Sequence, residues 1–248
     1  MTNDEVAAAL LRLVALIDAD LPKTFYPGER VWRPIAAGYM ARMADIARST
    51  AVLTLAGCSD DALILSRVMY EQMVGFCWIA AEPTSRIELW KDSYEAHQRA
   101  AHEDAKKYGI KLLTAKQLAK AKGKQKLSVE QLAKEADDYW SPRIDGFRVS
   151  SNKQQTIDLL TITGLYLGVY RVASRIVHGT VQSLDSVMRR SGKRTIVERR
   201  ASSTASFAPT AVPIFVMAIA VHHKLFGWPD IDKAREISDS LVWEPAAA

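Results

Sequence analysis

The stretch DDALILSRVMYEQMVGFCWIAAEP, residues 60–83, decides the fold. Apolar side chains occupy nearly every side of a helix drawn from Leu63 to Ile79, which is the pattern of a helix buried at the centre of a bundle. Pro83 follows at a position typical of the first turn of the next helix. The stretch therefore predicts a central helix against which the other helices pack.

Two charged residues interrupt this apolar stretch. Arg67 and Glu71 are spaced i and i+4, so their side chains can meet on one face of the helix. A buried charge is costly unless it is paired and hydrogen-bonded, so both side chains must find partners. The pair is either an internal brace that fixes the register of two helices or part of a polar site.

Helical periodicity extends over most of the chain, with Pro and Gly at the breaks. The capping residue Thr2, Asn3 or Asp4 precedes the first helix, and a short strand-like piece is expected at Thr195 to Val197. Further helices are expected over residues 34–57, 59–82, 83–109, 128–140, 156–178, 180–190, 213–225 and 230–242.

No repeat is visible, and no alternation of strands and helices suggests a parallel sheet. The sequence predicts an all-α fold, a single-domain helical bundle of about seven to nine helices over residues 1–248. Its core helices are expected near 34–81 and 156–190. A peripheral lysine-rich helical hairpin is expected near 106–140, where eight lysines from Lys106 to Lys126 stand without an acidic residue.

The composition bounds the class of protein. Lys and Arg number 33 against 28 Asp and Glu, a net charge of +5, which is a mild basic excess. Cys58 and Cys77 have neither metal-ligand spacing nor the density of a disulfide scaffold, so we expect a cytoplasmic protein without a metal or cofactor. The longest apolar run, near Pro213, is too short to cross a bilayer, so no membrane insertion is expected.

The second informative stretch is YRVASRIVHG, residues 170–179. On a helix, Arg171 and His178 lie only about 20° apart around the axis, with Ser174 and Arg175 beside them. A histidine is suited to general acid/base catalysis near neutral pH, and an arginine is suited to holding a phosphate. The same four residues also suit a buried hydrogen-bond cluster, completed by Arg67 and Glu71 from the central helix.

A segment with six Lys and Arg residues within a dozen positions follows that stretch, over residues 189–200. This density of positive charge is suited to contacts with nucleic-acid phosphates. An RNA strand bound there could run toward His178, whereas the preceding lysine run is more typical of a solvated face. The candidate nucleic-acid-binding residues are Arg189, Arg190, Lys193, Arg194, Arg199 and Arg200.

Together, SRVMYEQMVGFCWIAAEP and YRVASRIVHG resemble uncharacterised bacterial helical families related to the HEPN group, over Thr50 to Gly179. The resemblance implies a helical bundle, often dimeric, from a toxin-antitoxin or phage-defence system. It also implies a metal-independent ribonuclease that uses an Arg, four to six intervening residues and a His. Arg171 and His178 have six residues between them, and the position after the Arg, commonly polar, is Val172.

Two classes of function follow from these patterns. The leading hypothesis is a HEPN-like ribonuclease in which His178 is the general acid/base, Arg171 and Arg175 stabilise the phosphate, and Glu71 orients them. The alternative is a non-catalytic helical module that binds a protein or nucleic acid, or a small-ligand sensor with its pocket near Arg67. The expected partners are RNA and an antitoxin or defence-system subunit, in a homodimer or hetero-complex.

Overall fold

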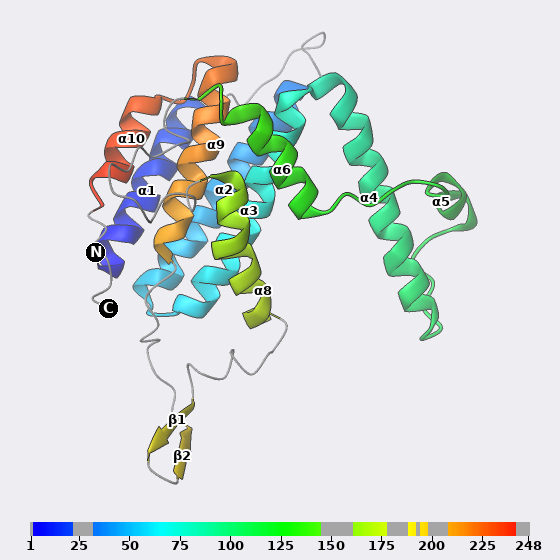
Figure 1. Ribbon diagram of the computed structural model, residues 1–248, viewed down its shortest axis with the longest axis horizontal. Helices are drawn as coiled ribbons and strands as arrows, with labels where there is room; N and C mark the ends of the chain where they lie inside the picture. The colour runs from blue at the N-terminus through cyan, green and yellow to red at the C-terminus, as the bar shows by residue number, and fades with distance from the viewer. Residues whose placement is uncertain are drawn as a thin grey trace.

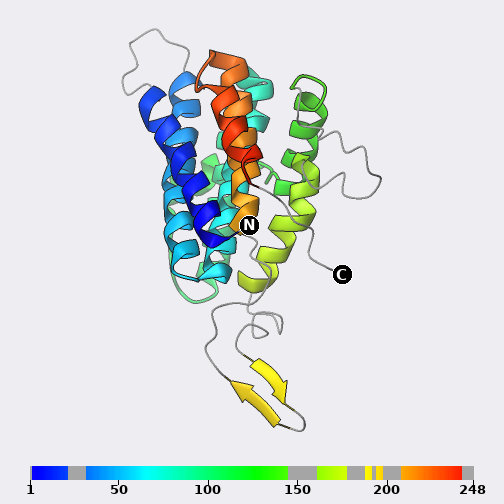
Figure 2. The same ribbon diagram turned by 90° about the vertical axis from the view of Figure 1, so that its left-hand side faces the viewer.

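The computed structural model describes most of the chain, and its elements are helical apart from one short hairpin of strands, which confirms the all-α prediction (Figure 1). The long helices α1 (Asn3–Asp20), α2 (Trp32–Leu55), α3 (Ser59–Ala81) and α9 (Ala211–Phe226) run side by side (Figures 1 and 2). The described residues are 2–21, 32–144, 161–177, 188–191, 194–197 and 208–241.

Helix α3 lies at the centre of the bundle, as its sequence predicts. It packs against α2, α9, α6 (Val129–Trp140) and α8 (Arg171–Val177). Residues on several sides of α3 are fully buried, because neighbours cover it from several directions. The largest of these side chains are Leu63, Met69, Tyr70, Met73, Phe76 and Ile79.

The first helix covers one side of that core. Thr2 caps α1, because its hydroxyl accepts from the backbone N–H of Glu5 while the Glu5 carboxylate accepts from the backbone N–H of Thr2. Its apolar stripe, from Val6 to Ile17, is buried against α2 and α9. The expected first helix is thus confirmed, with Thr2 as its cap.

Two tryptophans attach α6 to α3. The indole N–H of Trp140 donates to the backbone carbonyl of Cys77 at 2.8 Å, and that of Trp78 donates to Glu135 at 2.7 Å. Ser128 caps the start of α6 by accepting from the backbone N–H of Gln131. Both indole donors are therefore satisfied where the two helices meet.

Helix α4 (Pro83–Lys106) leaves the bundle instead of packing along it (Figure 1). It begins at Pro83, as predicted, but only Ile87, Ser93, Ala96 and His102 are buried along its 24 residues. A short helix, α5 (Ala115–Lys120), lies beside its distal half. A helix with so few buried side chains is not held along its length by the core.

The segment that carries the second motif is more broken than predicted. A helix was expected from Thr156, and residues 156–160 lie outside the described residues. The described helix begins at Ile162, because Thr161 has extended backbone and its hydroxyl caps the backbone N–H of Gly164. The turn α7 (Ile162–Leu165) continues into a π-helical turn, η1 (Tyr166–Tyr170), and then into α8. A π-helical turn inside a helix is often found at a functional site.

The described parts of the basic segment after α8 are two β-strands. The prediction of a helix up to about Arg190 is wrong at its C-terminal end. Met188–Ser191 form strand β1, which pairs antiparallel with β2 (Arg194–Val197). The strand expected at Thr195 to Val197 is confirmed as part of β2. Ser191 pairs with Arg194, and Met188 pairs with Val197.

The C-terminal helices close the bundle on the side of α1. Helix α9 begins after a 3-10 turn, η3 (Ala208–Thr210), and is followed by α10 (Ile231–Asp239), which Asp230 caps. Within the described ranges, no helix is both long and apolar enough to cross a bilayer.

Candidate functional site

The two motif-bearing segments lie against each other. Helix α3 packs on η1 and α8, so the prediction that the helices around Arg67 and the second motif are neighbours is confirmed. The guanidinium carbon of Arg67 lies 4.8 Å from the centre of the Tyr170 ring, within the range of a cation–π contact. Arg67 therefore connects the central helix to the start of α8.

Arg67 and Glu71 form the ion pair that their spacing predicts. The Nη2 atom of Arg67 lies 3.2 Å from Oε1 of Glu71, and their side chains are 18% and 33% exposed. Burial raises the pKa of Glu71, while the charge and hydrogen bond of Arg67 oppose that rise. The Nε atom of Arg67 is buried and has no hydrogen-bond partner among the described residues.

Tyr170, which contacts Arg67, is itself in contact with two further tyrosines. The rings of Tyr166 and Tyr170, one helical turn apart, stack with centroids 5.1 Å apart, and the Tyr70 ring lies 6.0 Å from that of Tyr170. Tyr70 is fully buried and donates to the backbone carbonyl of Ile162 at 2.8 Å. Burial raises the pKa of Tyr70 well above its ordinary value.

The outer part of the stack is open to solvent. Tyr166 and Tyr170 are half-buried, and Tyr166 donates to Glu130 of α6 at 3.2 Å. Burial raises the pKa of Tyr166, the carboxylate of Glu130 adds to the rise, and Arg171 opposes it. Arg171 is exposed, and its effect on the pKa of Tyr166 indicates that its charge lies near this edge of the stack.

Ser174 is occupied within its own helix. Its hydroxyl donates to the backbone carbonyl of Tyr170 at 2.6 Å, one turn earlier, which is a common arrangement for serine inside a helix. The backbone of Arg175 belongs to α8, but its side chain is not described. His178 lies outside the described residues.

The predicted nucleic-acid-binding residues fall partly on the hairpin. Arg189 and Arg190 belong to β1, where they pair with Ile196 and Thr195, and Arg194 begins β2. The side chains of these three residues are not described, and Lys193, Arg199 and Arg200 lie outside the described residues.

The tyrosines are what sequence reasoning missed at this site. Tyr170 stands in the motif YRVASRIVHG, but no role was predicted for Tyr70 or Tyr166. The spacing of Tyr166 and Tyr170, i and i+4, was a usable signal, because residues at that spacing are neighbours on a helix. Finding Tyr70 requires knowing which helix packs against which.

One cavity lined by described residues lies elsewhere in the molecule. It measures about 180 Å³ and lies where the end of α6 meets α9 and α10, beside Arg143, His223, Lys224 and Arg235. Arg235 is within 3.8 Å of Asp232, and the guanidinium of Arg143 stacks over the Tyr139 ring. A small-ligand pocket was expected near Arg67, and this cavity is lined by other elements.

Comparison with known proteins gives one match. Residues 34–195, more than half of the chain, match a family of unknown function, DUF5677, and this span runs from α2 into β2. It includes Arg67, Glu71, the tyrosine stack and α8. No curated protein and no solved structure matches the chain.

Proposed function

We propose that this chain, which belongs to the family of unknown function DUF5677, binds RNA at the face formed by α3, η1 and α8 and cleaves it there without a metal. The observation that carries the proposal is the half-buried Tyr166–Tyr170 stack, with Arg67 against the Tyr170 ring and the exposed cation of Arg171 near Tyr166. Aromatic rings beside cations are suited to stacking unpaired bases while holding their phosphates.

The chemistry would use the residues that follow the stack. The ribose 2′-hydroxyl attacks the adjacent phosphorus, the bond from phosphorus to the 5′-oxygen breaks, and His178 protonates the departing oxygen. The proton of the 2′-hydroxyl passes to a general base, a role that His178 of a second copy would fill in a homodimer. Arg171 and Arg175 stabilise the added negative charge on the phosphate.

Arg67 and Glu71 position this machinery. Glu71 holds Arg67 by an ion pair, and Arg67 in turn supports the Tyr170 ring, so the start of α8 is fixed relative to the central helix. A site residue held by a second layer of contacts keeps its geometry without reorganisation during the reaction. In this proposal Glu71 orients Arg171 and His178, as expected, by acting through Arg67 and Tyr170.

The wider setting of the proposal follows the resemblance to the HEPN group. In it the chain is a single cytoplasmic domain with a peripheral lysine-rich hairpin, dimeric or bound to an antitoxin or defence-system subunit.

A second candidate is a non-catalytic interaction module. It is favoured by the hydrogen bond that ties the Ser174 hydroxyl to the Tyr170 carbonyl and by the pairing of Arg67 with Glu71. In both contacts a polar group of the face is paired within the protein and is less available to a substrate.

An RNA cleavage assay in EDTA separates the two candidates. Purified wild-type protein is incubated with mixed RNA beside His178→Ala, Arg171→Ala and a control, Arg42→Ala, which removes an exposed arginine from α2. The proposal predicts cleavage by wild type and control, and a loss of about 10²-fold or more in His178→Ala. If none of the four proteins cleaves RNA, and the wild type retains a partner protein in a pull-down, the result would instead favour the interaction module.

A further inference from the structure

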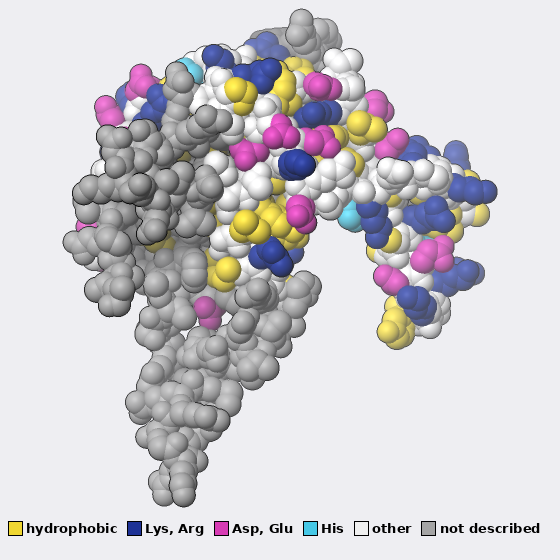
Figure 3. Space-filling view, in the orientation of Figure 1, with side chains coloured by type: hydrophobic (Ala, Val, Ile, Leu, Met, Phe, Trp, Pro, Cys, Tyr) yellow, Lys and Arg dark blue, Asp and Glu magenta, His cyan; other side chains and the backbone are white. Residues whose placement is uncertain are grey.

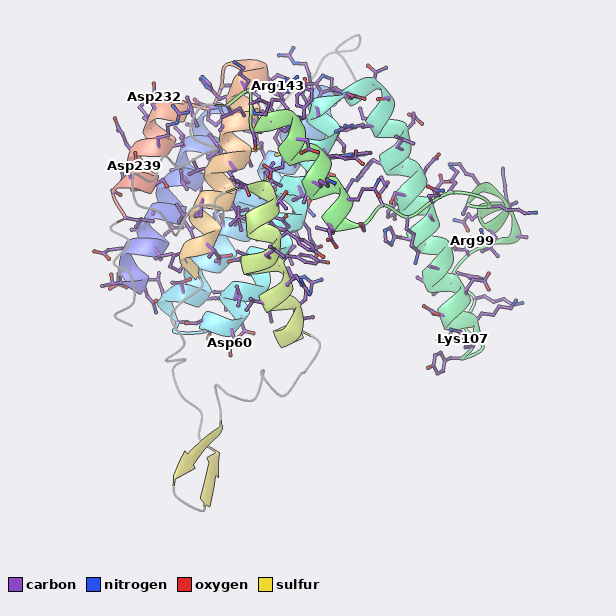
Figure 4. The ribbon with its side chains drawn as sticks, in the orientation of Figure 1. Asp60, Arg99, Lys107, Arg143, Asp232 and Asp239 are labelled. Carbon is purple, nitrogen blue, oxygen red and sulfur yellow. The ribbon has the colours of Figure 1, made fainter. Side chains whose placement is uncertain are left out.

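The distal half of α4, the following turn and α5 form a projection that we call the arm, residues 97–126 (Figure 1). Arg99 and Lys107 lie along it, away from the bundle (Figure 4). Lys and Arg side chains gather over its surface (Figure 3). The arm is thus a distinct basic feature of the molecule.

The arm carries all of the excess charge of the chain. It holds nine Lys and Arg against two Asp and Glu, a net charge of +7, whereas the other residues hold 24 against 26, a net charge of −2. A mild basic excess spread over a whole chain mainly aids solubility, but one confined to a projection attracts polyanions.

The arm is held in shape by specific hydrogen bonds. Buried His102 of α4 accepts through Nδ1 from the backbone N–H groups of Leu112 and Leu113, at 3.1 and 3.0 Å. Thr114 and Gln117 form a reciprocal capping box at the start of α5. A basic surface on such a scaffold presents its charges at fixed positions, so less order must be gained on binding.

Six of the eight lysines of the arm fall into two groups; of the other two, Lys107 pairs with Asp104, and the charge of Lys126 acts on the same carboxylate. Lys120 and Lys124 pair with carboxylates on the proximal part of α4: Lys120 with Glu95 at 2.5 Å, and Lys124 with Glu95 and Asp92 at 2.6 Å each. These pairs attach the returning chain to α4 and leave little charge for a ligand.

The second group faces solvent. Its members are exposed and have no ion pair within the described part of the chain; they are Lys106, Lys111, Lys116 and Lys122. Four unpaired cations on one projection require counterions from solution, and a nucleic-acid strand that replaces these ions gains the entropy of their release.

An exposed aromatic ring lies among these lysines. Tyr108 is 83% exposed and stands in the turn between Lys106 and Lys111. An isolated lysine cluster would attract any polyanion, but an exposed ring beside it also offers a stacking surface for an unpaired base. A duplex keeps its bases stacked inside, so this combination favours a single strand.

We propose that the arm binds single-stranded RNA through Lys106, Lys111, Lys116 and Lys122, with Tyr108 stacking on a base. Binding of a single strand follows from the charge and the exposed ring alone. The choice of RNA over DNA rests on the proposed function. The surface is separate from the Tyr166–Tyr170 face, so the arm captures a strand and does not take part in its chemistry.

Fluorescence anisotropy with a labelled oligouridylate tests the charges. The arm variant replaces the four exposed lysines by Gln, and a matched control replaces four exposed cations of the bundle by Gln: Arg12, Arg42, Lys134 and Lys224. Both variants lose the same charge. We expect the arm variant to bind at least about tenfold more weakly and the control to bind within about threefold of wild type.

The salt dependence gives a second reading. Each phosphate contact contributes roughly 0.7 to the slope of log affinity against log salt for a single strand. The arm variant should lose a slope of about 2 to 3, and the control should keep the wild-type slope. Equal affinity of the arm variant and wild type, or an equal loss in the control, overturns the proposal.

The stacking role has its own pair of variants. Tyr108→Ala should weaken binding at least about fivefold, and Tyr108→Phe should restore it, because the ring and not the hydroxyl stacks. Polyglutamate that displaces the probe as well as unlabelled RNA does would overturn the proposal in favour of an acidic protein partner. A tighter complex with oligothymidylate than with oligouridylate would overturn the choice of RNA.

These measurements also separate the two proposals. The binding assays are repeated with His178→Ala, so that cleavage cannot consume the probe. Binding through the arm without any cleavage by wild type contradicts the proposed function and leaves the arm proposal standing. Cleavage by wild type, together with an arm variant that binds as tightly as wild type, contradicts the arm proposal and leaves the proposed function standing.

Discussion

The face around Arg67 and the arm around Lys107 use similar side chains in opposite environments. Arg67 pairs with Glu71 at 18% exposure and lies over a tyrosine ring, whereas Lys107, 71% exposed, pairs with Asp104 in solvent. A half-buried pair is strongly coupled to the packing around it, but an exposed pair contributes little to stability. The comparison teaches that burial separates the cations that build the fold from those left to meet a ligand.

The helices that carry these pairs differ in the same way. Helix α3 is covered by neighbours on several sides, while α4 has few buried residues and extends past the bundle. Substitutions in the bundle should therefore change global stability, and those in the arm should act locally. The following substitutions test that division, from the largest expected effect to the smallest.

Removing an indole gives the largest contrast. Trp140→Ala should lower the free energy of unfolding by about 3 to 5 kcal/mol, since it leaves a cavity beside α3 and removes the hydrogen bond to the Cys77 carbonyl. Tyr108→Ala in the arm should leave the free energy of unfolding within about 0.5 kcal/mol of the wild-type value, because this side chain is exposed. Urea denaturation measures both. Similar losses in the two variants would contradict the division between bundle and arm.

Acid should weaken the bundle through His222. This side chain is fully buried among Phe76, Phe226 and Trp228, and burial lowers its pKa to about 4. The unfolded chain binds a proton at this histidine near pH 6.5 and the folded chain does not. Stability is therefore present above pH 6.5 and is lost as pH falls toward 4, by about 3 kcal/mol.

Denaturation as a function of pH measures this loss. His222→Phe should flatten the profile between these pH values, because the variant has no proton to take up at this position. The substitution also removes the hydrogen bond between Nδ1 of His222 and the backbone carbonyl of Trp228, at 3.3 Å, and this loss lowers stability without adding a change with pH. A profile unchanged by the substitution would show that other groups carry the acid sensitivity.

Breaking one ion pair in each region gives a smaller contrast. Arg67→Ala should cost about 2 kcal/mol, below the value for a fully buried pair, because Glu71 keeps partial access to water. Lys107→Ala should leave the melting temperature unchanged, since its pair lies in solvent. Thermal denaturation compares the two. The opposite ranking would contradict the assignment of Arg67 to the framework.

The smallest global effect is expected from a buried histidine of the arm. His102→Leu removes the acceptor for the backbone N–H groups of Leu112 and Leu113. Hydrogen exchange at these two amides should accelerate by at least about tenfold, with exchange in α3 unchanged. Faster exchange in both places would show that the arm folds together with the bundle.

The sequence predicted the helices where periodicity and caps agree. Thr2, Ser128 and Pro83 stand at starts chosen from local chemistry, and those starts are correct. The apolar pattern of α3 identified the central helix, because a helix covered on many sides must be apolar on many sides. The pairing of Arg67 with Glu71 followed from spacing alone.

The errors arose where local pattern was a weak guide. Apolar periodicity continued before Ile162, but Thr161 adopts extended backbone and caps the helix there. A helix was expected up to about Arg190, yet antiparallel pairing with Arg194–Val197 makes Met188–Ser191 a strand, an effect that helical periodicity does not encode. The contact of Arg67 with Tyr170 likewise depends on which helices meet.

The division between a capturing arm and a cutting face is tested most directly by single-turnover RNA cleavage in EDTA, with increasing protein concentration. The arm variant should raise the half-saturating concentration by about tenfold and keep the maximal rate within about twofold, whereas Arg171→Ala should lower the maximal rate by about 10²-fold. No cleavage by wild type, or an equal fall of the maximal rate in both variants, would contradict the account.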